Sequence, residues 1–308
     1  MQNFLHTIFG WLLLTTTVAV SAQTQRGRAV EAFVASEQLR SASVSFCVLD
    51  VSTGQVIAQH DPLRSLAPAS ALKTVTTASA LALLGPNYQF KTTLSYTGTL
   101  DGDGSLAGDL YLQGFGDPTF GSDQMAGLPG LEGTLLRMVQ ATQQSGIRAV
   151  EGRVFGDGSY FETAAHVPTW QWNDLGNYYG AGAFGLNINE NLYQLHFTQT
   201  AQGEVPPISG TTPPLPDLNV RNEVLSAGPR TGDNAYIYGA HYTNERYVRG
   251  TIPAGSGTFT IKGSIPEPPL TAARLFAEAL AAYGVEVDPM RTNGRPRRRI
   301  ARARLHPI

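Results

Sequence analysis

Lysine and cysteine are scarce in this sequence of 308 residues, and charged residues make up only 15% of it. The three lysines are Lys73, Lys91 and Lys262, and the single cysteine, Cys47, cannot form an internal disulfide. A formal net charge of -2 provides no basic field, which argues against nucleic acid as a partner. The six histidines are scattered without ligand spacing, so we expect no metal site, and no motif indicates a cofactor.

Glycine and proline are abundant, with 33 and 19 residues spread along the chain. Both residue types interrupt regular structure, so their number predicts many turns and a strand-rich body. Hydrophobic residues make up 42% of the sequence, which is enough for a core, and the length allows about two domains. Cys47 lies in the alternating run SVSFCVLDV, where we expect it to be a small buried side chain.

The N-terminus resembles an export signal. Residues Phe4 to Val20 form an apolar and threonine-rich run, and Val20-Ser21-Ala22 offers small residues for cleavage before Gln23. This predicts a signal peptide over residues 1–22 and an exported protein of the periplasm or cell envelope. The run has no Lys or Arg before it, and the alternative is a retained anchor, although a membrane span needs about 20 residues.

Periodicity and turn residues predict a mixture of helices and strands. Apolar spacing favours helices at Gly27–Leu39, from Pro68 to Gly85, at Leu131–Gln144 and at Thr271–Tyr283. Alternation and bounding turns favour strands at Ser43–Asp50, Gln55–His60, Tyr193–Thr198, Tyr247–Ile252 and Thr258–Ile261. The segment GEVPPISGTTPPLPDL between these elements is expected to be a proline-rich loop.

A serine and a lysine stand three residues apart at the start of one expected helix, in LAPASALKTVTTASALALLG. Positions i and i+3 lie on the same helix face, so Lys73 can reach the hydroxyl of Ser70. Serine is a weak nucleophile until a base takes its proton, and a helix N-terminus favours an oxyanion. The spacing therefore indicates a catalytic pair, with a solvent-facing Ser and Lys at a helix start as the alternative.

Several longer segments, one of which contains Ser70 and Lys73, match one known family. Five segments follow one another in the order LAPASALKTVTTASALALLGPNYQF, GDLYLQGFGDPTF, GRVFGDGSYF, WQWNDLGNYYGAGAFGLNINENLYQLHF and VRGTIPAGSGTFTIKGSIPEPPLTAARLFAEAL. Together and in this order they resemble the D-alanyl-D-alanine carboxypeptidase and endopeptidase family. This family comprises the class C low-molecular-mass penicillin-binding proteins, serine peptidase family S13. The resemblance runs from about Ala29 to Val287, which is nearly all of the chain after the signal segment.

The resemblance implies an α+β fold class. Part of a β-lactamase- or transpeptidase-like domain, an antiparallel sheet flanked by helices, would carry large strand-rich inserted domains. The implied organisation is listed in chain order: residues 23–86 as the N-terminal part of the transpeptidase-like domain, 87–266 as an inserted region of two subdomains, and 267–290 as a return helix. The last segment, residues 291–308, holds seven arginines and no acid. We expect it to be disordered or read past a gene interruption, and the alternative is a polyanion-binding tail.

The resemblance also implies a substrate and roles for three residues. Peptide stems and cross-links of peptidoglycan would be the substrate, and β-lactam antibiotics would inhibit the full-length enzyme. By position, Ser70 would be the acylated nucleophile and Lys73 its general base. Asp174, in WNDL, matches an acidic position that helps to bind the free amino group of the stem peptide, with a helix or turn cap as its alternative role. Nothing in the sequence indicates an oligomeric state.

Two further motifs of the family are missing from the 308 residues. No serine is followed two residues later by asparagine, and no lysine is followed by Thr-Gly. We therefore expect a truncated, weakly active or inactive chain, with Val75, Leu81 and Leu84 partly exposed because strands that cover the nucleophile helix are absent. The main alternative is a non-catalytic module that binds peptidoglycan or a protein. A serine esterase or β-lactamase-like hydrolase on the same scaffold fits the large insertions less well.

Overall fold

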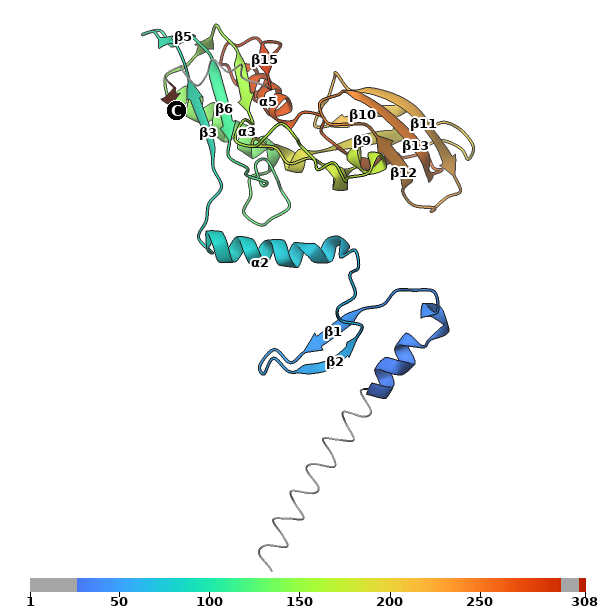
Figure 1. Cartoon of the computed structure of the whole chain (residues 1–308). Coiled ribbons are helices and arrows are strands. Elements are labelled where there is room, and N and C mark those ends of the chain that lie inside the picture. Colours follow the sequence, from blue (N-terminus) through green and yellow to red (C-terminus); the bar gives the residue numbers. More distant parts are fainter. Residues whose placement is uncertain (1–26, 295–304) are drawn as a thin grey trace, which may run out of the picture. The chain divides into compact units, whose positions relative to one another are not determined.

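A computed structural model describes residues 27–294 and 305–308, so the expected signal segment at 1–22 lies outside the described residues. The chain divides after Tyr88 into two compact units, which are described separately (Figure 1). Helices occur together with several small, mostly antiparallel sheets, and the expected α+β class is confirmed. Within the described residues, no helix is both long and apolar enough to cross a membrane.

The first unit contains a hairpin between helical segments. Its elements in chain order are a helical stretch at 27–34, η1 (Glu37–Leu39), β1 (Phe46–Leu49), β2 (Val56–His60), η2 (Ala69–Ala71) and α2 (Leu72–Leu84). Strands β1 and β2 pair antiparallel. The carboxylate of Asp50 accepts backbone N–H bonds from Ser52 and Thr53, at 2.9 Å each, which fixes the turn that the sequence predicted.

None of the described residues of the first unit is buried. Cys47 is exposed, so the expectation that it is a small buried side chain was wrong. The alternating pattern was read correctly as a strand, but a sheet of only two strands leaves both of its faces accessible. A segment that buries so little apolar surface gains little from the hydrophobic effect by itself.

The second unit holds the remaining elements and the whole buried core. Its strands are β3 (Thr92–Tyr96), β4 (Thr99–Leu100), β5 (Ser105–Ala107), β6 (Leu110–Gly114), β7 (Ala149–Val150), β8 (Val154–Asp157), β9 (Leu192–Thr198), β10 (Ile208–Thr212), β11 (Asn219–Ala227), β12 (Asn234–Tyr238), β13 (Glu245–Pro253), β14 (Thr258–Ser264), β15 (Thr292–Asn293) and β16 (His306–Pro307). Its helices are α3 (Gly130–Gln144), α4 (Trp172–Leu175), η3 (Tyr178–Gly180), η4 (Asn189–Asn191) and α5 (Pro268–Ala282). The predicted helices at 131–144 and 271–283 and the predicted strands at 193–198, 247–252 and 258–261 are therefore confirmed.

Two groups of sheets and a small three-stranded sheet, β4-β5-β7, make up the second unit. A five-stranded sheet in the order β15-β8-β6-β3-β16 has α5 packed on β8 and α3 packed on α5. The other group contains two three-stranded sheets, β10-β9-β14 and β11-β13-β12 (Figure 1). Buried apolar residues from Leu106 to Val285 form one continuous core cluster across these elements. The second unit is therefore the part of the described chain that hydrophobic burial stabilises.

Helix α5 approaches strand β8 very closely at Gly156. A Cβ atom on Gly156 would lie 1.9 Å from the backbone carbonyl oxygen of Pro269, at the start of α5. The buried face of the helix includes Ala272, Ala273 and Phe276, whose small and flat side chains permit this approach. Only glycine can occupy this position of the strand without moving the helix.

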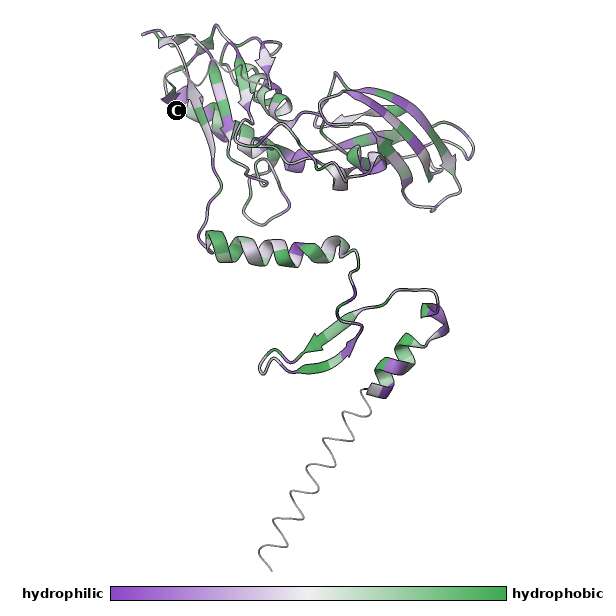
Figure 2. Cartoon of the chain, viewed as in Figure 1, coloured by the Kyte–Doolittle hydropathy of each residue, from purple (hydrophilic) through white to green (hydrophobic). Residues whose placement is uncertain are grey.

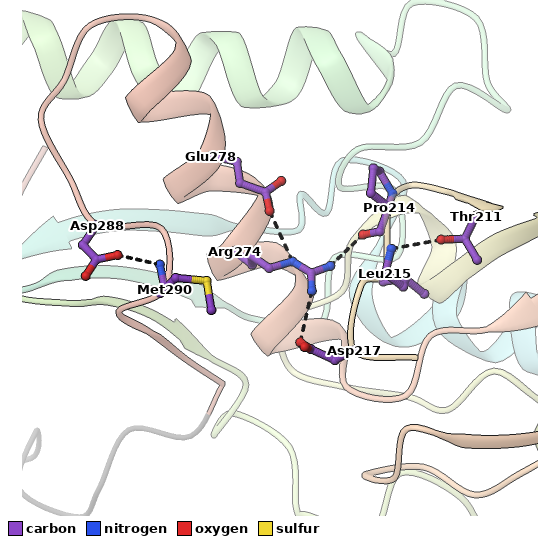
Figure 3. Close-up of polar contacts among 8 residues, drawn as sticks. All are labelled: Thr211, Pro214, Leu215, Asp217, Arg274, Glu278, Asp288 and Met290. Carbon is purple, nitrogen blue, oxygen red and sulfur yellow. Dashed lines mark hydrogen bonds and ion pairs between the residues drawn. The ribbon is translucent and has the colours of Figure 1, made fainter. Parts of the chain in front are cut away.

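A half-buried arginine joins α5 to the proline-rich loop between β10 and β11. Arg274 Nη2 donates to the carbonyl oxygen of Pro214 at 2.6 Å, and its Nη1 donates to the Asp217 carboxylate at 3.4 Å (Figure 3). Its Nε forms an ion pair with Glu278 at 3.5 Å. The side chain is 14% exposed, so these contacts fasten the loop to the helix in a partly dehydrated setting.

Both described ends of the arginine-rich tail form strands, which differs from the expected disorder. Strand β15 pairs in parallel with β8, and β16 pairs antiparallel with β3. The ring of His306 stacks on Tyr96 at a centroid distance of 5.0 Å. Backbone pairing and this stacking order the ends of a segment whose composition offers little core. Helix α5, expected to return to the transpeptidase-like domain, packs on β8, and the expected domain bounds stay predictions.

The contact at Gly156 yields a stability prediction. Substitution Gly156→Ala is expected to lower the free energy of unfolding of the second unit by about 2–4 kcal/mol, because the new methyl group displaces the start of α5. Urea denaturation measures the change. Gly102→Ala is the matched control, since a Cβ there meets nothing within 4 Å. Equal stability of the two variants would contradict the close approach.

Candidate active site

Ser70 lies in the single turn η2 directly before helix α2. The N–H of Ala71 donates to the carbonyl of Pro68 at 3.0 Å, which begins the turn. Ala69 has a φ of 45°, a left-handed conformation that is uncommon for a residue with a side chain. This conformation sets the direction of the chain just before Ser70.

Lys73 lies one turn after Ser70 and contacts it. Lys73 Nζ donates to Ser70 Oγ at 3.1 Å, so the reach that the i, i+3 spacing predicted is present. The hydroxyl of Thr77 donates to the carbonyl of Lys73 at 2.8 Å, on the following turn of the helix. Both Ser70 and Lys73 are exposed to solvent. The distance of 3.1 Å between Lys73 Nζ and Ser70 Oγ lies within the range over which a proton can be transferred.

Helix α2 has apolar residues on all sides, and none of its residues is buried. Val75 is 62% exposed, Leu81 59% and Leu84 50%, as expected from the sequence. A helix of this composition is normally found inside a protein core. The surface around Ser70 is therefore able to accept further packing on every side of the helix.

Asp174 lies in the short helix α4 of the second unit. Its backbone N–H donates to Gln171 and its carbonyl accepts from Asn177, each at 3.0 Å. No side-chain hydrogen bond caps this helix, so the contacts of Asp174 in the turn come from its backbone. The structure joins Ser70 to Lys73 in the first unit, whereas Asp174 belongs to the second.

Sequence reasoning missed the tyrosines beside Asp174. Burial raises the pKa of Tyr179, and the negative charge of Asp174 raises it further, followed by smaller effects of Tyr236 and other tyrosines. The rings of Tyr178 and Tyr179 meet edge to face at 5.2 Å. The density of aromatic residues in WQWNDLGNYYG is the signal that could have identified this cluster. Asp174 thus has aromatic neighbours, which favour a ligand with both charged and apolar parts.

A histidine pair fixes the segment that leads into α4. Nδ1 of His166 lies 3.0 Å from Nδ1 of His241, and the ring of Trp170 lies 6.3 Å from that of His166. Burial lowers the pKa of His241 to about 4, and the positive charges of His166 and Arg246 lower it further. His241 is therefore neutral near pH 7. In the described part of the chain, no group of three or more His, Cys, Asp or Glu side chains could hold a metal ion.

The fold resembles that of penicillin-binding proteins. The crystal structure of penicillin-binding protein 4 (dacB) from Haemophilus influenzae matches with a TM-score of 0.62 and 21% identity, over 82% of this chain and 53% of that one. The same protein complexed with a novel β-lactam matches with a TM-score of 0.55 and 18% identity, over 91% of this chain and 55% of that one. At these identities the likeness shows the fold alone.

Residues 27–295 match the D-Ala-D-Ala carboxypeptidase 3 (S13) family, and the chain belongs to this family. A D-alanyl-D-alanine carboxypeptidase from Actinomadura sp. (strain R39) is 28% identical over 265 residues, covering 84% of this chain and 47% of the relative. The D-alanyl-D-alanine carboxypeptidase DacB of Haemophilus influenzae is 23% identical over 248 residues, covering 80% and 49%. The chain thus spans about half the length of the curated relatives that it matches.

The low pKa of His241 predicts acid sensitivity of the second unit. In the unfolded chain the imidazole of His241 has its ordinary pKa of 6.5. As the pH falls, His241 therefore binds a proton in the unfolded chain before it does so in the folded protein. Above about pH 6.5 this effect of His241 leaves the free energy of unfolding unchanged. As the pH falls from 6.5 towards 4, the free energy of unfolding decreases by about 1–3 kcal/mol in total.

Thermal unfolding of wild type and His241→Gln between these pH values measures this loss. The substitution should flatten the pH dependence, whereas His196→Gln, which alters a half-buried histidine of β9, should not. The same pH dependence in His241→Gln and wild type would show that another group is responsible.

Proposed function

We propose that the chain functions as a serine-type D-Ala-D-Ala carboxypeptidase and endopeptidase that acts on peptidoglycan stem peptides and cross-links through an acyl-enzyme on Ser70. The observation that carries this proposal is the 3.1 Å contact between Lys73 Nζ and Ser70 Oγ at the start of α2. Membership of the S13 family supports it. The 308 residues alone are proposed to be weakly active or inactive.

The proposed reaction begins with proton transfer. In its neutral form the amine of Lys73 takes the hydroxyl proton of Ser70, and Ser70 Oγ attacks the carbonyl carbon between the two D-alanines. The N-terminal end of the helix favours the negative charge that develops on the carbonyl oxygen. The C–N bond breaks, the leaving amine receives the proton, and water then hydrolyses the ester on Ser70. A β-lactam would acylate Ser70 in the same way.

Asp174 is proposed to bind the free amino group of the stem peptide. Support comes from its half-buried side chain, which caps no helix, and from the neighbouring ring of Tyr179. A carboxylate paired with an ammonium group gives a strong, charge-assisted hydrogen bond, and an aromatic ring excludes water beside it.

Export to the periplasm or cell envelope is part of the same proposal. Its support is the apolar segment that ends with Val20-Ser21-Ala22, and the substrate is extracellular. N-terminal sequencing of protein from the cell envelope should begin near Gln23, and recovery with Met1 intact would reject it.

A non-catalytic module that binds peptidoglycan or a protein is the second candidate. The observation that favours it is the exposure of the apolar helix α2, none of whose residues is buried. The exposed apolar surface of α2 would then serve association alone.

A fluorescent penicillin distinguishes these two functions. We expect the purified 308-residue chain to be labelled about 10²- to 10³-fold more slowly than a complete enzyme, because a Lys-Thr-Gly strand that completes the oxyanion hole is missing from it. Addition of the C-terminal half of a family member should restore labelling. Ser70→Ala is the control, which should remain unlabelled in both experiments.

Two outcomes would contradict this expectation. Stoichiometric labelling of the chain alone, lost in Ser70→Ala, would show that residues within this sequence replace the missing motifs. Labelling that persists in Ser70→Ala would reject Ser70 as the nucleophile.

The role of Asp174 is tested by peptide binding. Asp174→Asn should weaken binding of a stem peptide with a free amino group about 10- to 100-fold, because a charge-assisted hydrogen bond is lost. Calorimetry with the free and the N-acetylated peptide measures this difference, since the variant should bind the acetylated peptide like wild type. Asp103→Asn, in the turn between β4 and β5, is a control that should change neither affinity. Unchanged binding in Asp174→Asn would exclude the role.

A further inference from the structure

The outer face of the β11-β13-β12 sheet carries tyrosines and arginines. Strand β13 alternates between buried Arg246 and Val248 on one face and exposed Tyr247 and Arg249 on the other. Register then places two rows across the exposed face, one of Tyr236, Arg249 and Glu223 and one of Tyr238, Tyr247 and Arg221. Directly paired residues lie on the same face of a sheet. We name the set of Tyr236, Tyr238, Tyr247, Arg221, Glu223 and Arg249 the tyrosine–arginine face.

This face is accessible and its charged groups are paired. Tyr236 is 47% exposed and Tyr247 42%. Glu223 forms ion pairs with Arg221 at 2.7 Å and with Arg249 at 2.6 Å, and Arg249 in particular lowers the pKa of Glu223. The guanidinium of Arg221 lies 6.0 Å from the centre of the Tyr247 ring. Hydrophilic and hydrophobic bands alternate along these strands (Figure 2).

The chemistry of the tyrosine–arginine face suits a neutral carbohydrate. Pyranose rings place their C–H groups on aromatic ring faces, and their hydroxyl and acetamido groups bond to planar guanidinium and carboxylate groups. Tyr236 on β12 and Tyr247 on β13 are diagonal neighbours on this face, about 7–8 Å apart, so one glycan strand can contact both rings. The carboxylate between Arg221 and Arg249 offsets much of their charge, so the face lacks the strong positive field that a polyanion requires.

The face adjoins the candidate peptide site. Helix α4, which carries Asp174, packs against β12, which carries Tyr236 and Tyr238. Both of these tyrosines raise the pKa of Tyr179, as Asp174 does, so the two tyrosines and Asp174 all lie close to Tyr179. A stem peptide is joined covalently to a glycan strand, so a peptide bound at Asp174 brings its sugars to the neighbouring surface.

We propose that the tyrosine–arginine face binds the N-acetylated glycan strand of peptidoglycan. The choice of this glycan rests on the proposed function, which supplies the stem peptide. Binding of the glycan at the tyrosine–arginine face requires no reaction at Ser70. Sugar rings lie over Tyr236 and Tyr247, and Arg221 and Arg249 donate to their oxygen atoms. The strand thereby holds the substrate near Asp174 without contributing to catalysis.

The test uses glycan strands from which an amidase has removed every stem peptide. The 308-residue chain should bind them, and a hexamer of N-acetylglucosamine, in calorimetry. The double variant Tyr236→Ala/Tyr247→Ala should bind at least about tenfold more weakly, because two stacking contacts are lost. Tyr283→Ala, which removes an exposed tyrosine at the end of α5, is the matched control. Thermal unfolding confirms that each variant is folded.

The outcomes separate this proposal from the proposed function. Ser70→Ala and Asp174→Asn should bind the stripped strands like wild type, whatever their effect on peptide or penicillin. Equal affinity of the double variant and wild type, or no binding of either glycan, would overturn the proposal. Binding of heparin in preference to both glycans, lost on adding salt, would also overturn it, because it would identify a polyanion site.

Discussion

The backbone contact between Gly156 of β8 and Pro269 of α5 is the constraint on which the second unit depends. It brings the helix against the five-stranded sheet, and from that position Arg274 reaches the proline-rich loop at Pro214 and Asp217. The loop belongs to the other group of sheets, so a single helix contacts both groups. One close approach, made possible by a missing side chain, thus sets the position of a helix that contacts both groups of sheets.

Much of this architecture could be predicted because it depends on local pattern. The apolar spacing at 131–144 and 271–283 predicted two helices, and alternation in β9 and β13 predicted two strands, all of which are present. Which sheet a helix covers depends on contacts between distant residues, and the apolar face of α5 fits many sheets equally well. Likewise, alternation identified the strand of Cys47 but could not reveal that its sheet has only two strands.

The candidate site was predictable to the same degree. Helix geometry brings residues three apart together, so Ser70 and Lys73 were found from spacing alone. The ring of Tyr179 beside Asp174 and the part-buried pair of His166 and His241 arise from tertiary contacts, and the left-handed conformation of Ala69 is a property of the backbone. None of these has a short sequence signature. The buried polar groups concentrate in the unit that has a core, where an unpaired charge is costly.

The ends of the five-stranded sheet have a consequence for self-association. Its two edge strands, β15 and β16, both come from the last 18 residues of the chain and are only two residues long. Each covers part of a neighbouring strand, β8 or β3, whose backbone N–H and C=O groups could otherwise pair with another molecule. These two short strands therefore occupy edge positions at which a strand of another molecule could otherwise pair.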